Sequence, residues 1–166
     1  MAKRTSPKRS QRGFTLVELM VTTAIIGILA AIAVVGYIEW VDKARIAKAE
    51  TFLALIKTKQ ESYRNRFGYY VTAPANPSGT PPISGQYEDW DSAQAAWRSL
   101  GAQPGQSRVG FQYETRGGTG LCSPKAGFNG TCGGAPTGNW FWATAENSKV
   151  IVIANSVRPN VWTIAK

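Results

Sequence analysis

The stretch GFTLVELM, residues 13–20, joins a short basic leader to a long apolar segment that carries one carboxylate, Glu18, near its start. Residues 19–38 contain no charged side chain. A helix of about 20 residues spans roughly 30 Å, the thickness of the hydrocarbon core of a bilayer. The core helix of a water-soluble domain is seldom apolar on every face over such a length. The stretch therefore predicts a helix that lies in a membrane or in the core of an assembly, with a buried core helix as the alternative.

Positive charge is concentrated ahead of this helix. The chain of 166 residues has a formal net charge of +9, and five of its nineteen basic residues lie in the first thirteen positions, where there is no acid. These five are Lys3, Arg4, Lys8, Arg9 and Arg12. Without them, fourteen basic and ten acidic residues leave a net charge of +4. Because lysine and arginine beside an apolar span keep their side in the cytoplasm, we expect the bulk of the chain on the outer side.

Three parts are predicted along the chain: a basic leader over residues 1–13, a transmembrane or filament-core helix over residues 14–38, and a globular head over residues 39–166. The leader is polar and is interpreted as unstructured, the alternative being a basic flank that is never removed. A standard secretory signal is cut after its apolar stretch, whereas a cut at Gly13 would leave the span attached. The head is long enough to bury a modest core.

One long helix is predicted over residues 14–67, because no proline occurs between Phe14 and Pro74 and the interior glycines, Gly27 and Gly36, are isolated. At 1.5 Å per residue such a helix is about 80 Å long, so its apolar half is expected to project from the domain. Residues 39–67 combine many charges with apolar residues at three- and four-residue spacing. This pattern predicts an amphipathic half that packs on the head.

The rest of the head is predicted to be a loop followed by a sheet. Residues 68–105 are rich in Pro, Gly and Ser and contain a short helix from Asp91, as N-cap, to Leu100. Residues 106–166 are expected to form an antiparallel sheet of about four strands with a Gly-rich, cysteine-containing loop at residues 116–138. The expected strands are residues 108–115, 139–145, 149–154 and 161–165. With the amphipathic helix packed on the sheet, the fold class is α+β.

The run GFTLVELMVTTAIIGILAAIA, residues 13–33, resembles the processing site and first helix of type IV pilins and of the related pseudopilins of type II secretion. The resemblance rests on Gly13 before Phe14, on Glu18 at the fifth position after this junction, and on Gly27 in a helix rich in Ile, Leu and Ala. It covers about the first third of the chain. The order of helix and then sheet is similar to the pilin-like fold of that family.

The resemblance implies a maturation pathway. A membrane aspartic protease, the prepilin peptidase, would cut between Gly13 and Phe14 on the cytoplasmic face, and the new amine of Phe14 would be methylated. The precursor would lie in the inner membrane, and inner-membrane assembly machinery would then add it to a filament of pilins in the periplasm or at the cell surface. Gly27 would permit local unwinding of the helix in the filament, without the proline that many major pilins have where this chain has Val35.

Glu18 also has a physical interpretation of its own. A carboxylate at the centre of a membrane helix costs about 2.5–3.5 kcal/mol, and less near the interface, so it requires a partner. A cut after Gly13 creates one, the positive amine of Phe14. Within one helix this amine and the positive end of the helix dipole favour Glu18. The family resemblance implies that the carboxylate meets the amine of a neighbouring subunit, which sets the axial register between helices.

The two cysteines, Cys122 and Cys132, lie in the part expected outside the cytoplasm, where thiols oxidise. A disulfide between them would close a loop of about 11 residues and contribute roughly 2.5–3 kcal/mol against unfolding. Two free thiols are the alternative. With no histidine and only these two cysteines, the chain has too few ligands for a conventional zinc site.

Other features of the head carry weaker hypotheses. The consecutive Trp140, Phe141 and Trp142 point to alternate faces of a strand, and covered core is favoured over a subunit contact. Seven basic residues could form a DNA-binding surface together with nearby aromatic residues, but scattered solvated charges are the favoured interpretation. These seven are Arg98, Arg108, Arg116, Lys125, Lys149, Arg158 and Lys166.

No catalytic residues, metal site or cofactor are predicted. The chain has no histidine, no cysteine paired with a base, and no defensible pair of catalytic acids. Glu88, Asp89 and Asp91 could form a weak calcium site, but an acidic loop ahead of a helix is the favoured interpretation.

The sequence therefore predicts a structural subunit of a type IV pilus, not an enzyme. The alternatives are a minor pilin that primes the filament, adheres or binds DNA, and a pseudopilin of type II secretion.

Overall fold

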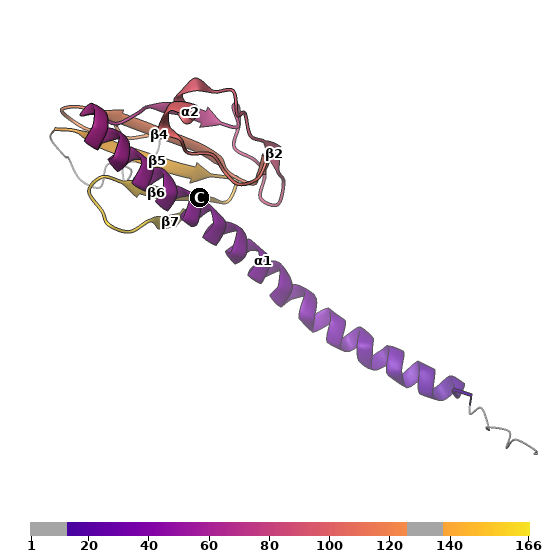
Figure 1. Ribbon diagram of the computed structural model, residues 1–166. Coiled ribbons are helices and arrows are strands. Elements are labelled where there is room, and N and C mark those ends of the chain that lie inside the picture. Colours follow the sequence, from indigo (N-terminus) through magenta and orange to yellow (C-terminus); the bar gives the residue numbers. More distant parts are fainter. Residues whose placement is uncertain (1–12, 126–137) are drawn as a thin grey trace, which may run out of the picture. The chain divides into compact units, whose positions relative to one another are not determined.

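The computed structural model describes residues 13–125 and 138–166 (Figure 1). The chain divides into two compact units, with the boundary between Val41 and Asp42. Helix α1 (Leu16–Phe67) has 52 residues and contributes to both units. The predicted helix over residues 14–67 is confirmed to within two residues at its start, which is the usual uncertainty of a helix end.

The first unit is the apolar part of α1. In this part the hydroxyl groups of the two threonines donate hydrogen bonds to backbone carbonyls of the preceding turn, as is common for threonine inside a helix. Thr22 Oγ1 donates to the carbonyl of Leu19 at 3.0 Å, and Thr23 Oγ1 donates to the same carbonyl at 2.9 Å. Neither hydroxyl therefore adds an unpaired polar group to the apolar surface.

The second unit contains an antiparallel five-stranded sheet of order β1-β4-β5-β6-β7, formed by residues in the described ranges. A separate antiparallel pair, β2-β3, and the short helix α2 complete it. The bounds are β1 (Ala73–Asn76), β2 (Glu88–Asp89), α2 (Ala95–Leu100), β3 (Arg108–Val109), β4 (Gln112–Gly118), β5 (Trp140–Glu146), β6 (Val150–Asn155) and β7 (Trp162–Ala165).

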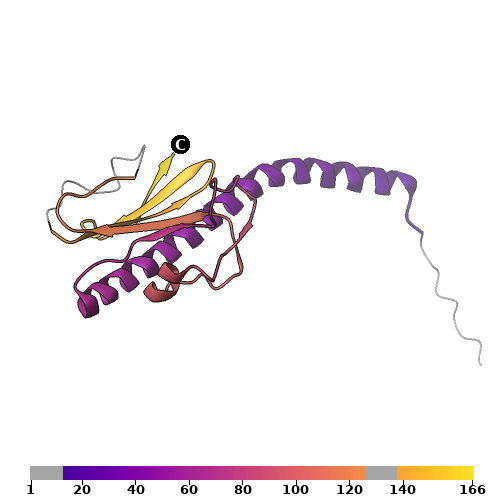
Figure 2. The same cartoon turned by 90° about the horizontal axis from the view of Figure 1, so that it is seen from above.

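One face of the five-stranded sheet is covered by the second half of α1 and by α2 (Figure 2). The helix contributes a fully buried row, Leu53, Ile56 and Gln60, at the spacing of one helix face. The sheet contributes small side chains to the same core: Ala143 and Ala145 of β5 are also fully buried. Small residues on the sheet let the helix backbone approach closely, and the amphipathic half of α1 packs on the sheet as predicted.

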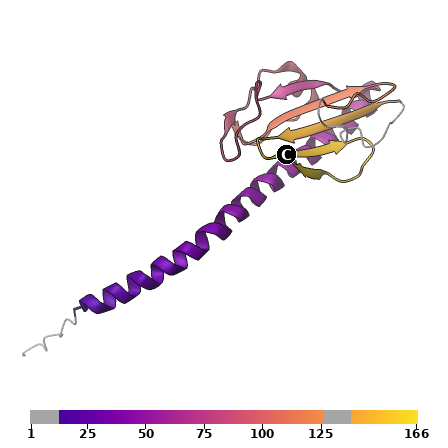
Figure 3. The same ribbon diagram turned by 180° about the vertical axis from the view of Figure 1, so that it is seen from behind.

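The opposite face of the sheet carries larger side chains, and the strands are seen from behind in Figure 3. Trp140 and Trp142 form a buried cluster there, with the half-buried Cys122 packed against them. Trp142 Nε1 donates to the carbonyl of Ser123 at 2.8 Å. Phe141 points to the other face and packs on Tyr70, with ring centroids 4.9 Å apart. All three consecutive aromatic residues are buried, so the covered-core interpretation is confirmed.

Three local predictions were wrong. The strand expected over residues 108–115 is two strands, because Gly110 and Phe111 separate β3 from β4 and the two belong to different sheets. Strand β4 then continues through Gly117 and Gly118, which were assigned to the loop at residues 116–138. Strand β1 forms within the Pro-rich segment because it pairs with β4, a contact far away in sequence that local composition does not encode.

The start of the short helix was also misplaced. Helix α2 begins at Ala95, with Gln94 in the N-cap position. The carboxylate of Asp91 instead accepts a hydrogen bond from the backbone N–H of Ala93 at 2.8 Å, which closes a turn ahead of the helix. The C-terminal end agrees with the prediction, because Gly101 adopts a left-handed conformation with φ of 68°.

Gly117 is required by the close approach of the segment that leads into β1. A Cβ atom built at Gly117 would lie 2.5 Å from Cβ of Tyr70 and 2.6 Å from its carbonyl oxygen. Both are fixed atoms, so neither can move aside as a flexible side-chain end would. We expect Gly117→Ala to destabilise the fold by about 2 kcal/mol, a fall in melting temperature of roughly 4–8 °C by thermal denaturation.

Gly105→Ala is the matched control, because an added Cβ there meets no atom within 4 Å. Equal melting temperatures for the two variants would contradict the packing role of Gly117.

Candidate functional site

The junction expected to be cut lies immediately before α1. Gly13 and Phe14 are exposed and precede the first helical residue, Leu16. A Cβ built at Gly13 meets no atom within 4 Å, so the described part of the chain leaves this peptide bond open. The side chain of Phe14 is 78% exposed. An extended, uncovered junction is what a protease needs to bind a peptide in its active site.

The start of the helix is capped by a residue that sequence reasoning missed. The backbone N–H of Glu18 donates to Thr15 Oγ1 at 3.2 Å, which satisfies one of the free N–H groups of the first turn. Threonine followed three residues later by glutamate is a known signature of a helix start, and this signal was present in the sequence. Thr15, one residue beyond Phe14, therefore fixes the start of the helix at Leu16.

Glu18 lies in the first turn of α1 and is exposed. No hydrogen bond or ion pair to its carboxylate occurs within residues 13–125 and 138–166. The positive end of the helix dipole lies in the same turn and favours an anion there. Gly13, Phe14 and Glu18 are thus brought together at one helix end, whereas Gly27 lies about 20 Å further along the axis from Phe14.

The apolar part of α1 is bare in this chain. A stretch of 18 residues in α1 has a mean hydropathy of 2.5, and none of it is buried, so the helix is long and apolar enough to cross a membrane. Ile32 and Val35 are both 72% exposed. A Cβ built at Gly27 or Gly36 meets no atom within 4 Å. Both glycines are therefore free of contacts with side chains elsewhere in residues 13–125 and 138–166.

The structure describes only one of the two cysteines of the predicted disulfide. Cys122 lies beside Trp140 and Trp142 on the face of the sheet opposite α1. Cys132 lies outside the described residues, so its pairing with Cys122 stays a prediction.

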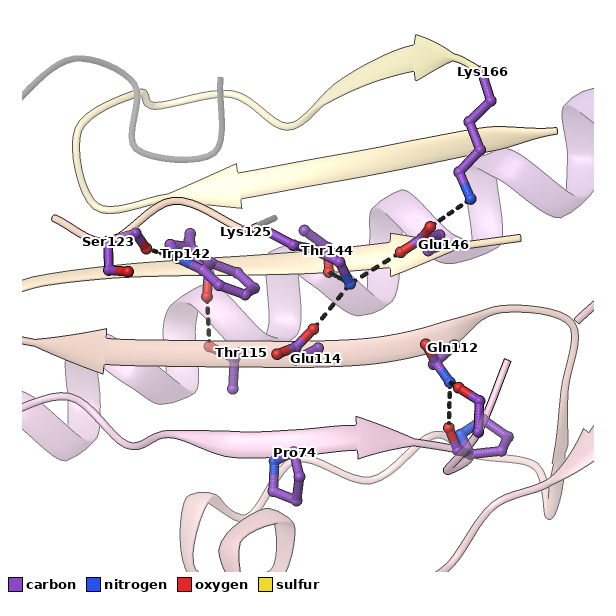
Figure 4. A network of polar contacts seen from close by, with 12 residues as sticks. Pro74, Gln112, Glu114, Thr115, Ser123, Lys125, Trp142, Thr144, Glu146 and Lys166 are labelled. Carbon is purple, nitrogen blue, oxygen red and sulfur yellow. Dashed lines mark hydrogen bonds and ion pairs between the residues drawn. The ribbon is translucent and has the colours of Figure 1, made fainter. Parts of the chain in front are cut away.

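A partly buried ionic cluster occupies the same face of the sheet (Figure 4). Lys125 Nζ lies 2.9 Å from a carboxylate oxygen of Glu114 and 2.9 Å from one of Glu146. Lys166 pairs with the other oxygen of Glu146. Two cations and two carboxylates thus balance one another, and Lys125 ties the segment after Cys122 to strands β4 and β5.

Burial and pairing act against each other in this cluster. Burial alone would raise the pKa of Glu146, but hydrogen bonds from Lys166 and Lys125 outweigh it and hold the pKa below its ordinary value. Burial alone would lower the pKa of Lys125, but hydrogen bonds to Glu114 and Glu146 raise it. Glu146 and Lys125 are therefore both charged at neutral pH.

The cluster changes the interpretation of the basic residues of the head. Lys125 and Lys166 were candidates for a DNA-binding surface, but both pair with carboxylates. Lys149 pairs with Asp42 at 3.3 Å. Arginine side chains stack on aromatic rings, with Arg158 at 4.8 Å from the Trp162 centroid. These pairings leave less positive charge for nucleic acid than the sequence count suggests.

The acidic residues ahead of α2 serve structural roles. Asp89 pairs with Arg108 at 3.4 Å across β2 and β3, and Asp91 closes the turn before α2. In the part of the chain that the structure describes, no group of three or more His, Cys, Asp or Glu residues could hold a metal ion.

The ionic cluster makes a testable contribution to stability. We expect Lys125→Met to destabilise the fold at pH 7 by about 2 kcal/mol, because Glu114 and Glu146 would lose the cation between them. The loss should shrink as the pH falls through the range in which Glu146 takes up a proton. A carboxylate with a lowered pKa stabilises the fold above that range and ceases to do so below it.

Thermal melts of both proteins between pH 7 and pH 4 would measure this effect. Lys149→Met is the control, because the Lys149 side chain is 65% exposed and an exposed pair contributes little. A pH-independent difference between Lys125→Met and the original chain would contradict the role of the carboxylates.

Comparisons with known proteins agree with the geometry of the N-terminal segment. The chain matches the family described as the prokaryotic N-terminal methylation motif over residues 8–34. It is similar to the type IV major pilin protein PilA of Myxococcus xanthus (strain DK1622), with 38% identity over 84 residues, covering 39% of this chain and 38% of that protein. A fimbrial protein of Pseudomonas aeruginosa is 44% identical over 54 residues, covering 32% of this chain and 35% of its own length.

The type IV major fimbrial protein FimA of Dichelobacter nodosus is 40% identical over 55 residues, covering 33% of this chain and 35% of that protein. The chain thus spans well under half the length of these three relatives, at most 38%. No solved structure matches it. The match at residues 8–34 and the apolar helix behind it show that this chain carries the prokaryotic N-terminal methylation motif ahead of an apolar helix, and that this N-terminal part is similar to type IV pilins and fimbrial proteins.

Proposed function

We propose that the protein is a structural subunit of a type IV pilus. The observation that carries this proposal is the methylation motif at residues 8–34 set directly ahead of a bare apolar helix. In this proposal a prepilin peptidase cuts after Gly13, and the amine of Phe14 is methylated. The subunit waits in the inner membrane, and assembly machinery draws it into a filament with other pilins.

The apolar surface of α1 supports assembly through this helix. A helix that leaves lipid must bury its apolar side chains elsewhere, and bundling with identical helices does so. Gly27, Ala30, Ala31 and Gly36 permit close approach between helix backbones. The head meanwhile has its own buried core, so the apolar part of α1 is available to partners without unfolding it.

Glu18 is proposed to select the register of that bundle. Its carboxylate has no partner within the described residues, and the proposed cut creates a free amine at Phe14 four residues away. In the filament the carboxylate of one subunit would meet the amine of the next. In a medium of low dielectric constant this pairing strongly favours one axial register over others.

The alternatives of minor pilin and type II secretion pseudopilin are less favoured. The relatives over the first third of the chain are named as major pilins and fimbrial proteins.

Gly13→Val tests the cleavage step. We expect the variant to insert in the membrane, to keep its leader and to be absent from filaments, because the peptidase must bind the backbone at this position closely. Mass spectrometry of the membrane fraction measures the retained leader. Gly27→Ala is the control, because it removes a glycine that lies beyond the junction. Its leader should be removed normally. Normal removal of the leader from Gly13→Val would contradict the proposed cleavage after Gly13.

Glu18→Ala tests the assembly step separately. We expect normal insertion and cleavage but more than a tenfold loss of incorporation into filaments that also contain the original chain. Leaving a charged partner unpaired costs on the order of 2–5 kcal/mol, which exceeds a tenfold change. Immunoblotting of sheared filaments gives the ratio. Glu39→Ala, a carboxylate on the same helix beyond the apolar run, is the control, and equal incorporation of both variants would contradict the pairing role.

A further inference from the structure

The second unit contains a cavity of about 610 Å³ that none of the features above uses. One wall is the face of α1 that carries Arg45, Lys48 and Phe52, and the other is formed by Tyr87 and residues 103–113. A volume of this size lies within the range of small-molecule sites, which are about 300–1,000 Å³.

The inner part of the cavity wall is aromatic. Phe52, Phe111 and Tyr113 line it and are 8%, 4% and 5% exposed, respectively. The rings of Phe52 and Tyr113 meet edge to face, with centroids 4.7 Å apart, and Trp90 packs on both from behind. The part of the wall formed by Phe52 and Tyr113 is therefore preformed, because each of these two rings is held by other rings.

One polar group in this wall is left without a partner. The hydroxyl of Tyr113 makes no hydrogen bond within residues 13–125 and 138–166, although its residue is 95% buried. Burial raises the pKa of Tyr113, so the hydroxyl keeps its proton and remains a donor. Because Tyr113 lines the cavity, this hydroxyl is available to donate to an acceptor group on a ligand.

The rim of the cavity is basic. Arg45, Lys48 and Arg108 line it, and none of the residues that line the cavity is acidic. Asp42 pairs with Arg45 at 2.8 Å and Asp89 with Arg108 at 3.4 Å, and both acids lie outside the lining. Lys48 is exposed and has no ion-pair or hydrogen-bond partner in the described part of the chain. The rim therefore presents one uncompensated ammonium group beside two guanidinium groups.

We propose that this cavity binds a small organic anion with a flat apolar body. The apolar body packs against Phe52, Phe111 and Tyr113, the Tyr113 hydroxyl donates to an acceptor on the ligand, and the anionic group meets Lys48 at the rim. Charge and aromatic lining act together here, so neither a bare anion nor a neutral ring uses the whole site. The proposal does not depend on the role of the chain in a filament.

Fluorophenyl phosphate is a suitable probe, because it combines a ring with an anionic group. Its binding to the full chain in detergent micelles can be followed by the broadening of its fluorine NMR signal. We expect saturable binding of the probe, at least tenfold weaker binding of fluorobenzyl alcohol, which has no charge, and poor competition by inorganic phosphate. Equal binding of the neutral ring, or full displacement by inorganic phosphate, would overturn the proposal.

Variants separate the cavity from the rest of the surface. Tyr113→Phe keeps the ring and should weaken binding about threefold to tenfold, the effect of one net hydrogen bond. Lys48→Gln should weaken it similarly, and Leu55→Trp should abolish it by filling the cavity. Lys59→Gln, a lysine of the same helix outside the cavity, should change nothing. Unchanged binding by both Tyr113→Phe and Leu55→Trp would exclude this cavity as the site.

Discussion

The fold of the head depends on one buried amide, the side chain of Gln60 on α1. Its Nε2 group donates to the carbonyl of Val71 at 2.7 Å and to Thr115 Oγ1 at 2.9 Å, while its Oε1 atom accepts from the N–H of Val71 at 2.9 Å. Thr115 Oγ1 in turn donates to the carbonyl of Trp142 at 2.8 Å. Burying an amide without partners would cost several kcal/mol. The helix can therefore occupy only the axial position at which these bonds form, since a shift of one turn would leave the amide unpaired.

This axial position of the helix determines which residues pack on each face of the sheet. With Gln60 fixed, Leu53 and Ile56 lie over the small residues Ala143 and Ala145, and Phe52 reaches the aromatic group around Tyr113. The sheet then has one face closed by the helix, and it carries its tryptophans and its ionic cluster on the other. The same helix supplies the bare apolar surface that the proposed filament uses, so one continuous element serves both the head and the assembly.

Prediction from sequence was most reliable where a local rule decides the structure. The absence of proline over one long stretch predicted α1 from end to end, and short stretches joined by brief turns predicted the strands that became β5, β6 and β7. It failed for β1, which lies in a Pro-rich segment and exists because β4 offers it a partner. Sequence reasoning also did not distinguish Lys125 from the solvated lysines, because the two carboxylate partners of Lys125 come from different strands.

The sequence by itself determined the features on which the proposed function rests: the junction of Gly13 and Phe14, the carboxylate of Glu18 and the length of apolar helix behind it. These depend on the order of neighbouring residues and on a helix whose hydrogen bonds are all local. Only the tertiary structure decided the partners of Gln60, the charge balance around Lys125 and the cavity lined by Tyr113. Each of these requires side chains far apart in the chain to meet, and that distance is closed only when the helix packs on the sheet.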